Sequence, residues 1–161
     1  MQSEHKEFLE KRHDANEWHG RGARGRRVIK DFDFDGSEIH GWTLQRARRD
    51  EQVKPPVIRS IWRHGESDSE LLSVDVFVCA SVKAAHDQLI EALGNFQSDA
   101  IERRTEKNAP GEVAFALNDT MVMFARGNLV VLIRNAGPKV VSVRAAARGL
   151  DALLARWGKS K

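Results

Sequence analysis

A short sequence occurs in two similar copies in this chain and constrains its fold more than any other feature. The residues SVKAA at 81–85 recur as SVRAA at 142–146, and leucines follow both copies at the same distances. Apolar residues in both places recur at spacings of three and four, which is typical of a helix with one buried side. Each copy comes after apolar, strand-like sequence. The repeat therefore predicts two related halves, each built from strands and one helix.

Most of the remaining sequence from residue 28 onward has the composition of β-strands. Valines in the segment 71–79 alternate with other residues, which predicts a strand with one face against the core. Asn118-Asp119 and Gly127-Asn128 favour tight turns, because these residue types tolerate positive φ. A polar connection is expected at 101–108. We expect strands at 28–34, 42–48, 57–63, 71–79, 112–117, 121–126 and 129–134.

The predicted fold class is α+β. We expect an antiparallel sheet with two helices packed on one face, in two related sheet-plus-helix halves. The helices are expected from Ser81 to Phe96 and from Ser142 to Trp157, with the two serines as N-caps. Asp151 is expected on the water-facing side of the second helix. The other face of the sheet is then solvated, or covered by another part of the chain.

The chain has 161 residues, which is the length of one domain. We place a single α+β domain at 28–161. Residues 1–27 are rich in charge and end in glycines and arginines, so we expect a short N-terminal helix and a Gly/Arg-rich linker. No apolar run is long enough to span a membrane, so we expect a soluble protein without membrane insertion. A cytoplasmic location fits the chain as given, and an extracytoplasmic one fits if a signal was removed.

Arginines are the most distinctive polar feature of the predicted sheet. The formal net charge is only +3, but arginines cluster within the predicted strands at 42–48 and 57–63. Residues that are two or four positions apart in a strand share one face. A basic face of this kind attracts phosphate or carboxylate groups, although an ordinary solvated face has the same pattern. The predicted ligand-binding residues are Arg46, Arg48, Arg59, Arg63 and the adjacent Trp62.

No pattern in the sequence predicts catalysis. Cys79 lies between a strand and a helix, but no base or oxyanion-binding motif accompanies it, so we expect a buried, unreactive thiol. The six histidines lack metal-binding spacing. The segment DFDFDG at 31–36 resembles the start of a calcium loop, but Trp42 stands where such loops need a glutamate. We therefore expect no catalytic residue, metal or cofactor, and inward-facing phenylalanines in 31–36.

These observations favour a noncatalytic binding or accessory module of unknown ligand. Two alternatives stay open. One is nucleic-acid or anionic-ligand binding through the basic sheet face, and the other is a small enzyme whose site is not visible from sequence. A protein partner, a homo-oligomer, an anionic ligand and a nucleic acid are all compatible with the chain.

The stretch FARGNLVV at 124–131, followed by a helix with Leu150, Asp151 and Leu154, resembles an ending found in many uncharacterised bacterial proteins. Those proteins are often secreted or lipid-anchored. The layout is also similar to the PsbP and Mog1 type of sheet covered by helices. The resemblance covers the last third of the chain and implies a noncatalytic bacterial domain, which in such proteins often lies outside the cytoplasm. The family has no catalytic residue to assign to this chain.

Overall fold

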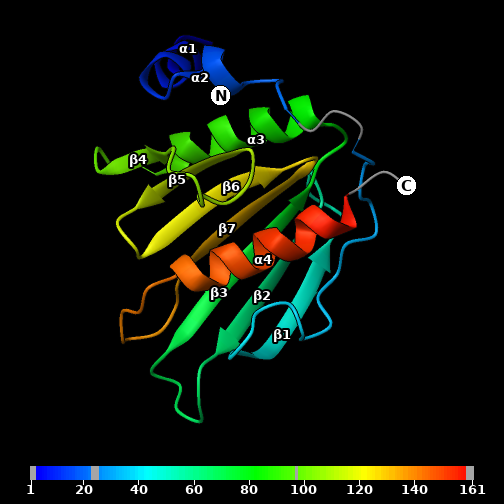
Figure 1. Cartoon of the computed structure of the whole chain (residues 1–161), viewed down its shortest axis with the longest axis vertical. Helices are drawn as coiled ribbons and strands as arrows, with labels where there is room; N and C mark the ends of the chain where they lie inside the picture. Colours follow the sequence, from blue (N-terminus) through cyan, green and yellow to red (C-terminus); the bar gives the residue numbers. More distant parts are fainter. Residues whose placement is uncertain (1–2, 23–25, 97, 159–161) are drawn as a thin grey trace.

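The computed structural model describes residues 3–22, 26–96 and 98–158, and it has an α+β fold (Figure 1). In these residues, seven strands form one antiparallel sheet in the order β1-β2-β3-β7-β6-β5-β4. The strands are β1 (Thr43–Asp50), β2 (Val57–Arg63), β3 (Leu71–Val78), β4 (Ile101–Arg104), β5 (Val113–Leu117), β6 (Met121–Arg126) and β7 (Leu129–Asn135). The helices are α1 (Ser3–Arg12), α2 (Ala15–Trp18), α3 (Val82–Asn95) and α4 (Arg144–Trp157).

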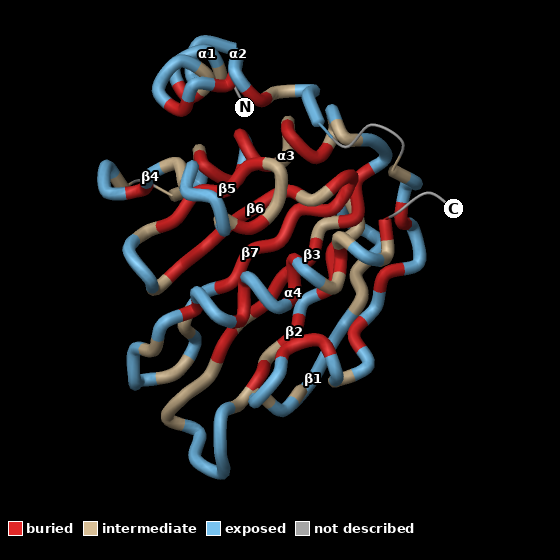
Figure 2. Tube along the Cα trace, viewed as in Figure 1, coloured by how far each residue is buried: buried red, intermediate tan, exposed pale blue. Residues whose placement is uncertain are grey.

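Helices α3 and α4 pack on opposite faces of the sheet, so the prediction that both cover one face is wrong. In β6, Met121 and Met123 belong to the apolar cluster of α3, whereas Phe124 belongs to that of α4. Successive residues of a strand point to opposite faces. Every residue from 121 to 125 and from 129 to 133 is buried, as Figure 2 shows along β6 and β7. Because both faces of these strands are apolar, each face needs its own cover.

The order of elements along the chain repeats, since β1–β3 lead into α3 and β5–β7 lead into α4. A relation between these two halves stays a prediction. Ser81 caps α3 as predicted, because its hydroxyl accepts a hydrogen bond from the Ala84 amide at 3.0 Å. The N-cap of α4 is Val143 rather than Ser142, so this boundary was off by one residue.

The segment 28–34 has no regular secondary structure and pairs with no strand of the described chain, so the strand predicted there is wrong. Arg49 explains this difference, because its guanidinium group donates to the carbonyls of Lys30 and Phe32 at 3.0 and 2.7 Å. A side chain thus replaces a strand neighbour. The inward phenylalanines are confirmed, since Phe32 and Phe34 are buried in the cluster of α4. The predicted polar connection contains β4, in which only Ile101 is buried.

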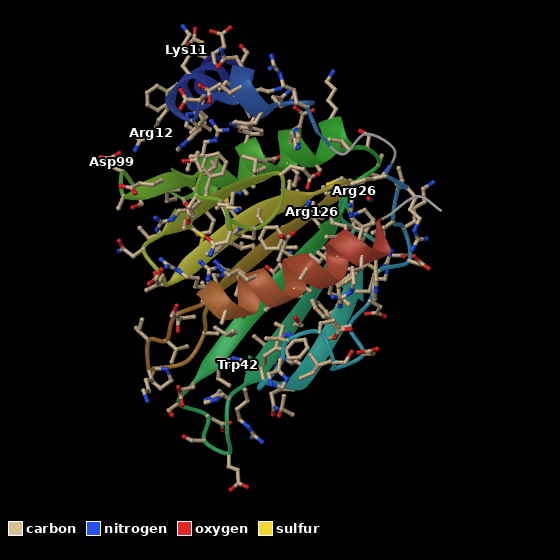
Figure 3. All side chains as sticks on the ribbon, viewed as in Figure 1. Lys11, Arg12, Arg26, Trp42, Asp99 and Arg126 are labelled. Carbon is tan, nitrogen blue, oxygen red and sulfur yellow. The ribbon has the colours of Figure 1, made fainter. Side chains whose placement is uncertain are left out.

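The N-terminal segment packs against the domain. The predicted N-terminal helix is confirmed as α1, and α1 and α2 contribute Leu9, Ala15 and Trp18 to the cluster of α3. At the other end of the segment, Arg26 donates to the Leu154 carbonyl at 3.0 Å, near the C-terminal end of α4 (Figure 3). None of the helices described here is long and apolar enough to cross a membrane.

Candidate functional site

All four arginines of the predicted basic site lie on one face of the sheet. Arg48 of β1 is the register partner of Arg59 in β2, and Arg59 is the partner of Asp75 in β3. Directly opposed residues of an antiparallel pair point to the same side. The alternation along each strand places the other members on this side as well. We call this surface the arginine face, and it consists of Arg46, Arg48, Arg59, Arg63 and Arg134.

This half of the sheet face is open because α3 covers only the other half. The row of register partners that contains Asp75 continues through Leu132, Met123 and Phe115 in β7, β6 and β5. These three residues are buried in the cluster of α3. The same face therefore carries charged and polar side chains among apolar ones on β1–β3 and at Arg134 in β7, and it is apolar on the rest of β5–β7. Within the arginine face, Arg46, Arg48, Arg59 and Arg134 are exposed and Arg63 is half-buried.

The guanidinium groups of the arginine face are only partly neutralised. Arg59 Nη1 lies 3.7 Å from Asp50 Oδ2, and Arg63 Nη1 lies 3.6 Å from Asp68 Oδ1. Ion pairs between such solvent-exposed groups contribute little to stability. Within the described ranges, three members form neither an ion pair nor a side-chain hydrogen bond: Arg46, Arg48 and Arg134. These three are available to a ligand.

Asp75 is a buried acid within the arginine face, with an exposed fraction of 7%. Burial raises the pKa of its carboxyl group, and the guanidinium groups of Arg134 and Arg59 partly offset this rise. A carboxylate at this position attracts both arginines and holds their charge near the middle of the sheet. Asp75 therefore stabilises the positive face from within the sheet.

The spacing of the arginines suits an extended anion. Arg46 and Arg48 are two residues apart, which corresponds to about 6.7 Å, and neighbouring strands lie about 4.8 Å apart. Guanidinium groups bind phosphate and carboxylate through paired N–H donors. Four cavities of the described chain are lined by other residues and by none of these arginines. The ligand would therefore lie along an open surface.

Trp62 lies on the opposite face and is not part of the arginine face, contrary to the prediction. Trp62 is fully buried, and its Nε1 donates to Ser60 Oγ at 2.9 Å. The centroid of its ring lies 5.6 Å from that of Phe34. Because neighbouring side chains in a strand point to opposite faces, Trp62 points into the core while Arg63 belongs to the arginine face. Arg134 was not predicted as part of this face. The residues before it in β7 are apolar at every position, so the sequence shows no alternation from which its face could be assigned.

Cys79 and His64 do not form a nucleophile–base pair within the described residues. The predicted burial of Cys79 is confirmed, and burial raises the pKa of its thiol to about 12, which disfavours the nucleophilic thiolate at neutral pH. His64 Nδ1 lies 3.4 Å from Glu70 Oε2 in the loop after β2, but no hydroxyl or thiol of the described chain bonds to that histidine. No group of three potential metal ligands is found among these residues.

Comparisons with protein-family models, with curated proteins and with solved structures found no match for this chain. The similarity to the PsbP and Mog1 layout and to secreted bacterial proteins therefore stays a prediction. The arginine face is defined by its own geometry.

Proposed function

We propose that the protein is a noncatalytic binding module that holds an anionic polymer, the phosphate backbone of a nucleic acid, on the arginine face. The observation that supports this most is the set of exposed, unpaired guanidinium groups on one uncovered half of the sheet. Five arginines there stand against three aspartates, of which Asp50 and Asp75 lie on the strands and Asp68 pairs with Arg63 from the loop after β2. Positive charge therefore remains after its own ion pairs are satisfied.

A polymer of phosphates fits this surface better than a single small anion. One exposed contact between a guanidinium group and an anion contributes only about 0–1 kcal/mol in water. A nucleic-acid backbone carries a charge at every nucleotide, and it releases condensed counterions when arginines neutralise its phosphates. Arginines spread over neighbouring strands contact several phosphates at once.

Binding of this kind is independent of base sequence. Single-strand binding proteins stack bases on exposed aromatic rings. Phe77 is the one aromatic residue on β1–β3 that shares this face, and it is half-buried against the cluster of α3. Contacts to phosphate fix position and carry no sequence information. Strands of different sequence are therefore expected to bind with similar affinity.

The test is a fluorescence-anisotropy titration of a short labelled single strand at several salt concentrations. If three to five phosphates are neutralised, the slope of log K against log salt is about −2 to −3.5. The variant Arg46→Ala/Arg48→Ala is expected to weaken binding and to make this slope shallower by about 1.4.

A matched control removes two exposed arginines from α4, on the other side of the sheet, as Arg148→Ala/Arg156→Ala. This control is expected to leave the slope unchanged. Equal effects of the two double variants would refute the assignment of the arginine face, and so would the absence of salt-dependent binding.

A further inference from the structure

We propose that the protein has a second binding site, for a small amphiphilic carboxylate, in a cavity at the end of the β1–β2 hairpin. The cavity has a volume of about 510 Å³. It lies between the loop that joins β1 to β2, the residues that follow β3 and the first turn of α3. No member of the arginine face lines it, so this site is independent of nucleic-acid binding.

The wall of the cavity is mainly apolar. Ligand cavities in proteins usually have volumes of about 300–1,000 Å³ and apolar walls with a few polar groups. Val53 is one of few large apolar side chains with substantial exposure in the described chain, at 39%. A ligand that covers it removes apolar surface from water. The apolar part of the wall is formed by Val53, Pro55, Pro56, Val78, Cys79 and Ala84.

The polar part of the wall has an excess of cations. Arg49 is already fully engaged, because its Nε donates to Glu51 Oε1 at 2.8 Å and its other nitrogens donate to backbone carbonyls. Lys30 and Lys54 also line the cavity, are exposed, and form no ion pair within the described residues. Two ammonium groups are therefore free beside an apolar wall.

This combination defines the class of ligand. An aliphatic chain gains free energy when it leaves water for the apolar wall. A carboxylate at one end of the chain forms charge-assisted hydrogen bonds with the lysines. A neutral amphiphile leaves the ammonium groups unpaired, and a phosphate polymer has no chain to place against the prolines. An acyl chain with one carboxylate satisfies both parts of the cavity.

Calorimetric titration with hexanoate, octanoate and decanoate tests the proposal. Each further buried methylene group lowers the Kd about fourfold, so two carbons lower it about 16-fold until the cavity is filled. Octan-1-ol, which has the same chain as octanoate, is expected to bind about tenfold more weakly because it lacks the charge. Equal affinity for the alcohol and the carboxylate, or no saturable binding of decanoate, would overturn the proposal.

Two variants locate the site. Ala80→Trp adds a large ring at an exposed position of the cavity wall, and it is expected to abolish octanoate binding. It should leave the salt dependence of nucleic-acid binding unchanged, so the two sites fail or succeed separately. Lys30→Gln/Lys54→Gln keeps the apolar wall and is expected to raise the Kd for octanoate about tenfold. If either variant, shown to be folded by circular dichroism, binds octanoate like the parent chain, the cavity is not the site.

Discussion

One arginine at the interface of β6 and α4 serves two carboxylates, which predicts unequal effects of removing its partners. Arg126 Nε and Nη2 donate to the two oxygens of Asp151 at 2.8 and 2.9 Å. Glu112 Oε2 lies 3.4 Å from the same Nε and has no hydrogen-bond partner in the described chain. Figure 3 places Arg126 beside α4, and its side chain is 21% exposed. The contact also corrects the expectation that Asp151 faces water.

The size of each effect follows from what remains after the substitution. In Asp151→Ala, Arg126 keeps Glu112 as a partner, so the loss is about 2 kcal/mol for the charge-assisted hydrogen bonds. In Arg126→Ala, two carboxylates with little exposure lose their shared cation. Removing one member of a buried pair costs about 3–5 kcal/mol. We therefore expect Arg126→Ala to be the more destabilising variant by at least about 1 kcal/mol.

The pH dependence of the stability lost in Arg126→Ala provides a second test. Burial raises the pKa of Glu112, and the Gly127 amide and Arg126 partly offset that rise. Without Arg126 the folded pKa rises further above the unfolded one, so at mildly acidic pH the native state binds a proton that the unfolded state does not. Stability from this proton is gained as pH falls and lost as pH rises. The cost of Arg126→Ala is expected to shrink between pH 7 and pH 5.

Urea denaturation at each pH measures both effects. Arg144→Ala is a control on the same helix, because it breaks an exposed ion pair with Asp119 of 2.8 Å and is expected to cost less than about 1 kcal/mol. If Asp151→Ala proves as costly as Arg126→Ala, the shared-arginine explanation is wrong. The same holds if both variants fall within the range of the control.

Two further predictions concern buried polar side chains. Burial, with a contribution from His19, lowers the pKa of His86 from 6.5 to about 4. The unfolded chain then binds a proton that the native state excludes. The free energy of unfolding should therefore fall by up to about 3 kcal/mol as the pH drops from 6.5 to about 4. If the stability of a His86→Phe variant, measured by urea denaturation, falls equally steeply over this pH range, the explanation is wrong. Asn128 exchanges hydrogen bonds with the backbone of Ile29 and donates to the Cys79 carbonyl at 2.9 Å, so Asn128→Ala should lower the urea-derived stability by about 3 kcal/mol. A loss below about 1 kcal/mol would show that these bonds are replaced.

The part of the sheet that could be predicted is the part buried on one side. In β3, Val74 and Val76 face the core while Asp75 lies on the other face, and this alternation is visible in the sequence. The same alternation is sufficient to group the arginines of β1 and β2 from the sequence alone. The contact between Arg126 and Asp151 joins residues far apart in the sequence, and no local pattern indicates it.

The placement of the helices could not be derived from the repeat at 81–85 and 142–146. An apolar stripe shows that a helix is buried on one side, but it does not show which face of a sheet it covers. The sequence feature that does indicate the placement of the helices is the pair of segments 121–125 and 129–133, which are apolar at every position. Such runs are typical of strands buried on both faces. They imply one cover on each side of the sheet.

The number of strands also explains why part of one face stays open, but it does not explain the arginines. A helix about 10 Å wide covers roughly two strands spaced at about 4.8 Å, so α3 with α1 beside it covers the far half of that face and leaves β1–β3 exposed. The exposure of β1–β3 explains why polar residues are favoured there, but it does not explain why so many of them are arginines. Arg48 and Arg59 are directly opposed in register, and like charges in such pairs destabilise a sheet. Equal numbers of acidic and basic residues would be as well solvated and would reduce this repulsion. An anionic ligand removes the repulsion, which is why the excess of arginines over aspartates on this face supports a binding role.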